Sequence, residues 1–415
     1  MGRSRLSELS APRRALVAAG IALFACGAAG WRQQAANLEG EYGLAVFVRG
    51  DSLHVHWLSA SPAEGRLEVV DPAAREPARA VLAQVGTPPG LAHHAVMRRP
   101  RQSEVTLRYG GAAGTPRYET TISLASPRRP PGSVPAVDSL YVLGDTHGMY
   151  DELISGLRNA GLTDADSRWA GGRKHLVFAG DLTDRGPDVL RLLWFVYRLE
   201  REAAAAGGRV HVVLGNHELM VMLGDLRYVH PKEAHIAELH RISYDRLLDV
   251  RTSLLGRWLA AKPGVLRVGG VLIAHGGVTT EHARQSLQQL NDTLHTYMRE
   301  DLFYYWNDST AQVPVDSVTL QRRVDFIWDE NSLFWHRGYI LTDTLENQLA
   351  EVLRRFDAQV LVVGHTTKPT VEARYAGRVI AAHSQQYGAE LVLLVRKPGG
   401  YERFRVGQPG PPVAF

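Results

Sequence analysis

The stretch L-V-F-A-G-D-L-T-D-R-G at residues 176–186 is the part of the sequence that decides the fold. Its first residues form an apolar run of the length of a buried strand, and Gly180-Asp181 ends that run. Asp184 and Arg185 follow within four residues, so charged side chains leave the strand directly on a loop. Loops at the carboxyl ends of strands are where open α/β sheets bind ligands. The stretch therefore predicts an α/β fold with a functional site at this loop.

Four other short apolar runs end in similar polar clusters. These are Gly144-Asp145-Thr146-His147-Gly148, Gly215-Asn216-His217-Glu218, His275-Gly276-Gly277 and Gly364-His365-Thr366. Glycine permits a sharp turn after each run, and loops at the ends of neighbouring strands converge on one crevice. Carboxylate, amide and imidazole side chains together suit Mn, Fe or Zn better than calcium. A pair of such ions about 3.5 to 4 Å apart needs a bridging carboxylate, for which Asp181 is the candidate.

The composition is that of an ordinary globular protein. The chain has 415 residues, of which 45% are hydrophobic and 22% charged, so it is long enough for two domains. The formal net charge of +4 arises without a dense basic run and without interleaved basic and aromatic residues. This pattern excludes nucleic acid as the expected partner and is compatible with phosphorylated substrates.

Residues 1–36 have the pattern of an export signal or an N-terminal anchor. Arg13 and Arg14 precede an uncharged, apolar segment at residues 15–30. Cys26, the only cysteine, lies in a lipobox-like Leu-Phe-Ala-Cys within it, so the mature chain forms no internal disulfide. A cleaved signal, a lipoprotein signal and an uncleaved anchor are all open. Each predicts export in a bacterium, with the protein periplasmic or anchored to the membrane and facing outside the cytoplasm.

The remaining chain is expected to form two domains. Residues 37–125 contain short alternating segments such as 53–58 and 66–70, separated by turn signals, and these predict a small all-β sandwich. Residues 126–137 form a Pro-rich linker. From residue 138 to 406 strands and helices alternate, beginning as βαβαβ, and residues 407–415 are expected to be a flexible tail.

The ordered set of clusters resembles the phosphoprotein phosphatase branch of the calcineurin-like metallophosphoesterases. Gly364-His365-Thr366 is similar in particular to bacterial Shewanella-like phosphatases. The resemblance implies an αββα sandwich for residues 138–406. The preceding β-domain resembles the fibronectin-like domain that precedes some secreted metallophosphatases.

The resemblance also implies roles for individual residues. The metal ligands would be Asp145 and His147 for the first ion, Asp181 for both, and Asn216, His275 and His365 for the second. The catalytic pair would be His217, a general acid that protonates the leaving oxygen, and Asp184, which orients it. The phosphate would be held by Arg185, by Asn216, and by Arg337 in the sequence F-W-H-R-G-Y at residues 334–339. Glu218 would be a hydrogen-bond acceptor rather than a ligand, Tyr387 would line the cleft, and His383 is interpreted as structural.

The implied activity is a metal-dependent phosphatase that hydrolyses phosphomonoesters on phosphoproteins, at tyrosine or at serine and threonine. A hydroxide between two divalent ions would attack phosphorus, with Mn expected first and Fe or Zn as alternatives. The alternative is an extracytoplasmic nucleotide phosphatase or dinucleoside polyphosphate hydrolase, since Asp-Arg-Gly-Pro-Asp at residues 184–188 also resembles that group. A non-catalytic binding module is disfavoured, because it has no physical reason to retain a general acid.

Overall fold

A computed structural model describes residues 38–75, 80–111, 117–299 and 316–415 of the chain. The predicted export segment, with Cys26, lies outside these residues. Among the helices in the described ranges, none has both the length and the hydrophobicity to span a membrane.

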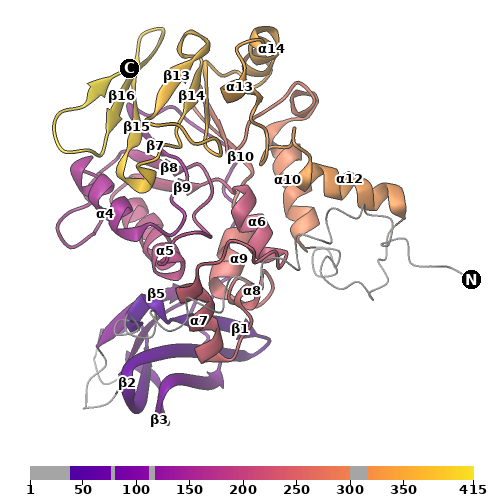
Figure 1. Ribbon diagram of the computed structural model, residues 1–415. Coiled ribbons are helices and arrows are strands. Elements are labelled where there is room, and N and C mark those ends of the chain that lie inside the picture. The colour runs from indigo at the N-terminus through magenta and orange to yellow at the C-terminus, as the bar shows by residue number, and fades with distance from the viewer. Residues whose placement is uncertain (1–37, 76–79, 112–116, 300–315) are drawn as a thin grey trace, which may run out of the picture.

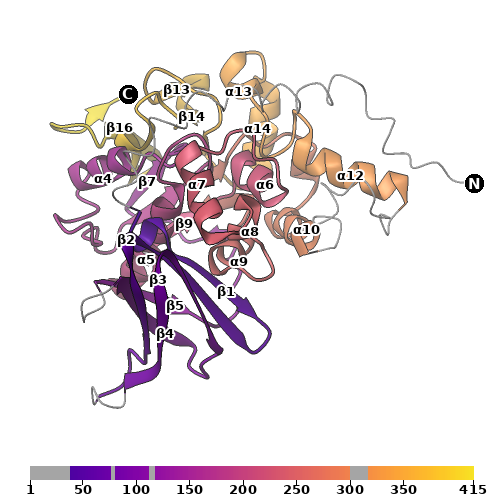
Figure 2. The same cartoon turned by 60° about the horizontal axis from the view of Figure 1, so that its bottom comes forward.

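Five strands near the N-terminus form one antiparallel sheet, which lies below the rest of the protein in Figures 1 and 2. They are β1 (Ala45–Arg49), β2 (Ser52–Val70), β3 (Val81–Arg98), β4 (Glu104–Gly111) and β5 (Tyr118–Ser123), preceded by the 3-10 helix η3 (Gly40–Tyr42). The 19-residue strand β2 pairs with β1 in its first part, with β4 in its last part, and with β3 on its other edge.

This single sheet differs from the expected β-sandwich, which requires two facing sheets. The segments 53–58 and 66–70 appear in the sequence as separate strands, but they belong to one continuous strand with register shifts between them. The register shifts accommodate the residues between the two segments within the strand. No turn therefore separates the segments. The sandwich and the fibronectin-like resemblance are therefore not confirmed.

The remaining strands form two six-stranded mixed sheets. The first has the order β17 (Val413–Ala414), β16 (Gly400–Val406), β15 (Leu391–Lys397), β7 (Ser139–Leu143), β8 (His175–Phe178), β9 (Arg209–Val212). The second has the order β13 (Glu372–Arg374), β14 (Val379–Ala381), β12 (Val360–Val363), β11 (Val271–Ala274), β10 (Val265–Val268), β6 (Ser133–Val134).

The two sheets pack face to face. Alternate residues of the strands, such as Val142 and Val177 in one sheet and Ile273 and Val362 in the other, belong to a single buried apolar cluster. Successive strand residues point to opposite faces, so their neighbours, such as Phe178, lie on the outer faces and belong to a second cluster that includes helical residues. Strands buried on both faces explain the continuous apolar runs in the sequence. The α/β metallophosphoesterase fold is thus observed.

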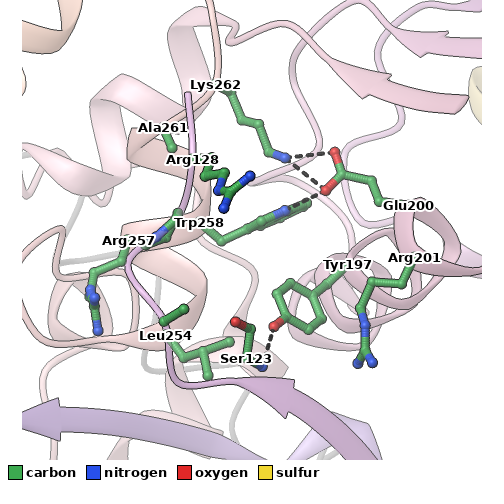
Figure 3. Close-up of a pocket in the computed structure, with 12 residues that line it drawn as sticks. Ser123, Arg128, Tyr197, Glu200, Arg201, Leu254, Arg257, Trp258, Ala261 and Lys262 are labelled. Atoms are coloured by element: carbon green, nitrogen blue, oxygen red, sulfur yellow. Dashed lines mark hydrogen bonds and ion pairs between the residues drawn. The ribbon is translucent and has the colours of Figure 1, made fainter. Parts of the chain in front are cut away.

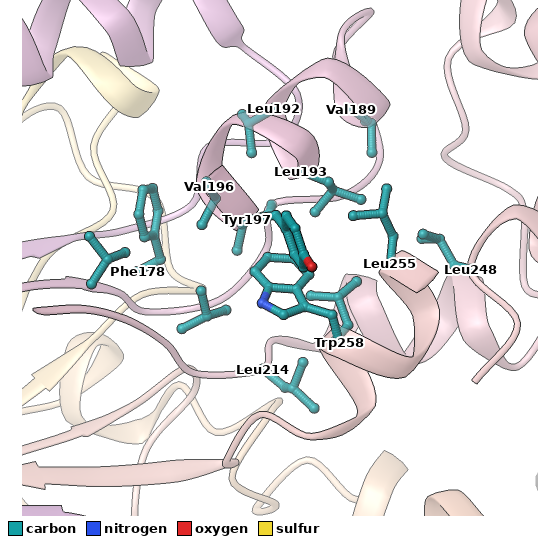
Figure 4. Close-up of a cluster of buried hydrophobic side chains, with 14 of the residues drawn as sticks. Phe178, Val189, Leu192, Leu193, Val196, Tyr197, Leu214, Leu248, Leu255 and Trp258 are labelled. Carbon is teal, nitrogen blue, oxygen red and sulfur yellow. The ribbon is translucent and has the colours of Figure 1, made fainter. Parts of the chain in front are cut away.

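Helices cover both outer faces. In Figure 1, α4 (Tyr150–Asn159) and α5 (Val189–Ala205) lie beside the first sheet, and α10 (Leu287–Arg299), α13 (Gly338–Leu341) and α14 (Glu346–Arg355) lie beside the second. Figure 4 shows Phe178 of β8 packed with apolar residues of α5 and with Trp258. The other helical segments are α6 (Asn216–Met222), α7 (Pro231–His240), α8 (Tyr244–Leu247), α9 (Leu254–Ala260), α12 (Ser317–Trp328), η4 (His282–Arg284), η5 (Tyr375–Gly377) and η6 (Tyr387–Ala389).

Two segments expected to lack regular structure each contain a short strand. Within the Pro-rich segment 126–137, β6 pairs in parallel with β10. Within the tail 407–415, β17 pairs with β16 and forms the edge of the first sheet. Both short strands lie at sheet edges, where they pair with backbone groups that would otherwise be exposed. A strand of two residues is too short to leave a periodic pattern in the sequence, so neither could be predicted.

A group of histidines lies where the N-terminal sheet contacts α7. His56 stacks on His94 of the neighbouring strand with ring centroids 3.9 Å apart, and it contacts the edge of His240 at 5.5 Å. His240 Nε2 donates to the Gly43 carbonyl at 2.8 Å. Burial lowers the pKa of His240 to about 4, and burial together with the neighbouring histidines and Arg49 lowers the pKa of His56 to about 2.

We expect this histidine group to make the protein lose stability in acid. Unfolded histidine has a pKa of about 6.5, so below that pH the unfolded state binds more protons, and the stability present above pH 6.5 is lost as pH falls toward 4. For His240 the loss is about 2 kcal/mol at pH 5. Thermal unfolding of His240→Gln should show a smaller difference between pH 7.5 and pH 5 than the wild type, whereas His235→Gln, an exposed residue of the same helix, should not. Equal pH dependence in His240→Gln and wild type would contradict this assignment.

Candidate metal centre

The strand ends of both sheets deliver the predicted site residues to one place. Asp145 and His147 follow β7, Asp181 follows β8, and Asn216 begins α6 just after β9. These three strands are parallel neighbours in the first sheet. From the second sheet, the parallel strands β11 and β12 are followed by His275 and His365 respectively.

Asp145, His147 and Asp181 form the first group of candidate ligands. His147 Nε2 lies 3.7 Å from Asp145 Oδ2 and 3.7 Å from Asp181 Oδ2, and it has no hydrogen-bond partner among the described residues. His147 Nδ1 donates to the Thr183 carbonyl at 2.8 Å, which leaves the Nε2 lone pair directed at the carboxylates. Ligands about 2.1 Å from one ion lie roughly 3 to 3.5 Å apart, so these donor atoms are slightly farther apart than they would be around a bound divalent ion.

The second group is centred on His275. Its Nε2 lies 2.9 Å from Asn216 Oδ1, 3.1 Å from Asp181 Oδ2 and 3.2 Å from His365 Nδ1. Its Nδ1 donates to the Ala179 carbonyl at 2.8 Å. Two oxygens and two ring nitrogens that can all act as acceptors thus converge on one buried point, which is a donor set suited to Mn, Fe or Zn.

Electrostatics around His275 support a cation at this point. Burial alone would lower the pKa of His275, but the carboxylates of Asp181 and Asp145 raise it to about 9. Asp181 is itself fully buried, and the surrounding histidines hold its pKa well below its usual value despite that burial. The site therefore favours positive charge, and a bound divalent ion would neutralise the same carboxylates.

Asp181 connects the two groups. Its Oδ2 faces both His147 and His275, whereas its Oδ1 accepts a hydrogen bond from the His217 main chain at 3.0 Å. The close approach requires glycine at position 215, because a Cβ there would lie 2.2 Å from Asp181 Oδ1. The geometry is that expected for a carboxylate shared by two ions.

The backbone at the site is strained. Five non-glycine residues there have φ between 46° and 67°, in the left-handed region: His147, Asp181, Asp184, Arg185 and His365. Such conformations cost of order 1–3 kcal/mol each and gather at functional sites. Packing and hydrogen bonds around the loops must therefore hold them in place.

Glu218 supplies many of these hydrogen bonds. It is fully buried, and its carboxylate accepts from the main-chain N–H groups of Gly215, Asp181, Leu182 and Thr183 at 2.7 to 3.1 Å. The Thr183 hydroxyl also donates to it. Burial and the Asp181 charge raise the pKa of Glu218, while these donors oppose the rise. The expectation that Glu218 is a hydrogen-bond acceptor is confirmed, and it fixes the loop that carries Asp181.

We expect Glu218→Gln to destabilise the protein. The amide NH₂ would face main-chain N–H donors, and leaving a buried donor unsatisfied costs about 1–3 kcal/mol. The midpoint of urea unfolding should fall accordingly, whereas Glu238→Gln, at a side chain that is 76% exposed, should leave it unchanged. An unchanged midpoint in Glu218→Gln would show that the loop does not depend on this carboxylate.

His217 and Asp184 form a hydrogen-bonded pair beside Asp181. His217 Nδ1 lies 2.7 Å from Oδ2 of the buried Asp184. Burial would lower the pKa of His217, but Asp181 and Asp184 together raise it above its usual value. His217 Nε2 lies 3.1 Å from Arg185 Nη2. A guanidinium cannot accept a hydrogen bond, so a protonated His217 and Arg185 each need an external acceptor, and one phosphate group can serve both.

His217 also lies close enough to His147 and Asp181 to be counted as a metal ligand. The positive charge of Arg185 beside its Nε2 argues against a cation at that position, and His217 Nε2 is 3.9 Å from Asp181 Oδ2. The proton-donor role fits this environment better.

Arg337 approaches from the opposite direction. Its Nη1 donates to the His365 carbonyl at 2.9 Å and lies 3.3 Å from Thr366 Oγ1. The structure thus places Arg337 beside the second group of ligands, and all the predicted site residues lie in one cluster. Tyr387 lies near it as well, with its ring centroid 6.3 Å from that of His147.

A cavity of about 260 Å³ lies elsewhere, between the end of the N-terminal sheet and helices α5 and α9 (Figure 3). Two of the charged residues that line it, Glu200 and Lys262, are paired with each other. Glu200 accepts from Lys262 at 2.6 and 2.8 Å and from Trp258 Nε1 at 2.7 Å. It shares no lining residue with the metal centre.

The sequence profile of the calcineurin-like phosphoesterase family matches residues 139–369. The chain belongs to this family, whose members hold a dinuclear metal centre. Its relatives include Shewanella-like protein phosphatase 2 of Arabidopsis thaliana, with 29% identity over 37% of this chain and 50% of the relative. The chain therefore spans about half the length of that relative.

Two further proteins are similar to this chain. The crystal structure of a cold-active protein-tyrosine phosphatase of a psychrophilic Shewanella species superposes with a TM-score of 0.63 at 29% identity, covering 76% of this chain and 96% of that one. The symmetrical bis(5'-nucleosyl)-tetraphosphatase of Salmonella paratyphi C is 29% identical over 41% of this chain and 54% of its own length.

Proposed function

We propose that this protein is a metal-dependent phosphatase that hydrolyses phosphomonoesters, with phosphorylated proteins as its substrates. The observation that carries the proposal is the pair of buried ligand groups joined through Asp181, with His217 and Arg185 directly beside them. The similarity to Shewanella-like protein phosphatases and to a protein-tyrosine phosphatase supports a phosphoprotein substrate.

Each residue has a defined part in this proposal. Two bound ions would supply a hydroxide near neutral pH and neutralise charge on the phosphoryl group. Arg185 and Arg337 would offer planar N–H forks to phosphate oxygens, and Asn216 would contact the same group. His217 would donate its Nε2 proton to the leaving oxygen, and Asp184 would hold the ring protonated and oriented through Nδ1.

Substrate comparison tests the proposal. The purified chain, loaded with Mn, is assayed on phosphotyrosine peptides, phosphoserine peptides, nucleoside monophosphates and diadenosine tetraphosphate. We expect kcat/KM on one class of phosphopeptide to exceed that on nucleotides by about 100-fold, which is roughly 2.7 kcal/mol of transition-state binding. Absence of hydrolysis of every substrate with Mn, Fe or Zn would refute the phosphatase proposal.

The second candidate is a nucleotide phosphatase or dinucleoside polyphosphate hydrolase. The similarity to the bis(5'-nucleosyl)-tetraphosphatase and the sequence Asp-Arg-Gly-Pro-Asp at residues 184–188 favour it. Faster hydrolysis of diadenosine tetraphosphate than of any phosphopeptide would select this function.

Tyr228 provides a way to recognise an aromatic leaving group. Its side chain is 45% exposed, its ring centroid lies 5.3 Å from that of His217, and the Arg185 guanidinium lies 5.9 Å from it. Aromatic pairs contribute about 0.5 to 1.5 kcal/mol beyond buried area, so Tyr228→Ala should reduce kcat/KM on phosphotyrosine peptides roughly 2- to 13-fold more than on phosphoserine peptides. Tyr228→Phe should retain the preference. Equal losses on both peptides would assign Tyr228 a general role in binding.

We also propose that the protein is exported, on the strength of the basic and apolar pattern of residues 1–36. Mass spectrometry of the mature N-terminus distinguishes a cleaved signal, a lipidated Cys26 and an intact anchor. Recovery of the intact chain from the cytoplasm would contradict export.

A further inference from the structure

His383 is buried beside the first group of candidate ligands. It follows β14 in the second sheet and is 1% exposed, and neither of its ring nitrogens has a hydrogen-bond partner among the described residues. An unsatisfied buried polar group costs about 1–3 kcal/mol. A purely structural role would leave this cost of two unpaired ring nitrogens without compensation. The interpretation of His383 as structural therefore does not account for them.

The ring of His383 is aimed at the metal centre. Its Nε2 lies 3.5 Å from Asp145 Oδ2, and the same oxygen lies 3.7 Å from His147 Nε2. The planes of the two imidazoles are inclined by 76°, with centroids 6.2 Å apart. Two ring nitrogens therefore flank one carboxylate oxygen of the first group of candidate ligands.

The main chain holds His383 in this position. Its carbonyl accepts a hydrogen bond from Lys368 N at 3.0 Å, which ties it to the loop after β12. On the other side, Gly144 packs so closely that a Cβ there would lie 2.6 Å from His383 Cα. The segments that carry Asp145 and His365 thus both contact the backbone near His383.

We propose that His383 is an additional ligand of the first metal ion, through Nε2, together with Asp145, His147 and Asp181. This inference rests on the proposed two-metal function. It gives each ion two oxygen and two imidazole ligands from the protein, since Asp181, Asn216, His275 and His365 surround the second ion. A matched donor set predicts similar affinity of the two sites for the same divalent ion.

Metal content of His383 variants tests this inference without reference to activity. We expect wild-type protein to retain two Zn ions per chain after dialysis, measured by plasma mass spectrometry. His383→Ala should retain one ion firmly, and the affinity for the other, measured by calorimetry, should fall at least about 10- to 100-fold. His383→Cys, which offers a thiolate ligand, should recover affinity, whereas His383→Gln, whose amide can donate a hydrogen bond to Asp145 but is a weaker Zn ligand than imidazole or thiolate, should recover less.

The control is His295→Gln, a buried histidine of α10 whose Nε2 donates to the Lys262 carbonyl. It should bind two ions with wild-type affinity. Two tightly bound ions in His383→Ala would overturn the inference, and so would full recovery of affinity in His383→Gln but not in His383→Cys, which would make His383 a hydrogen-bond donor to Asp145. If two ions bind but no phosphate ester is hydrolysed, the proposed function fails and the ligand assignment stands. If His383→Ala does not fold, His383→Gln and His383→Cys still decide the question.

Discussion

Asp181→Asn is expected to abolish phosphatase activity with little change in the fold. The amide keeps the shape of the side chain and retains an oxygen that accepts from the His217 main chain, but it removes the negative charge that both ligand groups share. Losing several kcal/mol of metal-dependent charge stabilisation corresponds to a decrease in kcat of at least about 1,000-fold. The measurement is hydrolysis of p-nitrophenyl phosphate with Mn added over a range of concentrations.

The matched control is Asp151→Asn. This residue lies in the first turn of α4 with its side chain 86% exposed, so the same chemical change there should leave kcat and metal content unchanged. Circular dichroism verifies that both variants are folded. Full activity of Asp181→Asn at saturating Mn would refute the role of this carboxylate as the shared ligand.

His217→Gln is expected to slow the reaction by an amount that depends on the leaving group. General acid catalysis contributes about 100- to 10,000-fold when a poor leaving group must be protonated. We therefore expect a loss of this size on phosphoserine peptides. On p-nitrophenyl phosphate, whose leaving group departs as an anion, the loss should be less than about 10-fold. A plot of log kcat against leaving-group pKa should be steeper for the variant.

The pH profile gives an independent readout of the same residue. The general acid must be protonated, and Asp181 and Asp184 raise the pKa of His217, so activity on phosphoserine should fall as pH rises through that elevated pKa. Asp184→Asn removes one source of the rise, and the fall should then occur at lower pH. Equal losses on both substrates in His217→Gln would instead indicate that His217 acts by binding phosphate.

The strands that carry the site could be predicted from the sequence because they are buried on both faces. The apolar run that ends before Gly144-Asp145 is observed as β7 (Ser139–Leu143), and the run that ends before Gly180-Asp181 is observed as β8 (His175–Phe178). Strand ends in a parallel sheet meet at one edge, which is why five clusters far apart in the chain could be assigned to one site. The ligand roles remain predictions that await metal analysis.

Features that depend on tertiary contacts could not be predicted in the same way. Residues 231–260 form three helices, α7, α8 and α9, because Arg241 adopts a left-handed conformation that ends the first helix. His383 follows a three-residue strand and has no glycine or acidic neighbour to mark it. Only its position across the sandwich from Asp145 reveals its proximity to the site.

The face-to-face arrangement of the two sheets has a mechanical consequence. The second proposed ion would take ligands from both sheets: Asp181 and Asn216 come from the first, whereas His275 and His365 come from the second. Bound metal would therefore act as a cross-link through the middle of the sandwich, in a chain whose single cysteine cannot form an internal disulfide. Ligands that bind only the folded state stabilise it in proportion to the logarithm of their concentration. Chelators would then act on this protein as reducing agents act on disulfide-bonded ones.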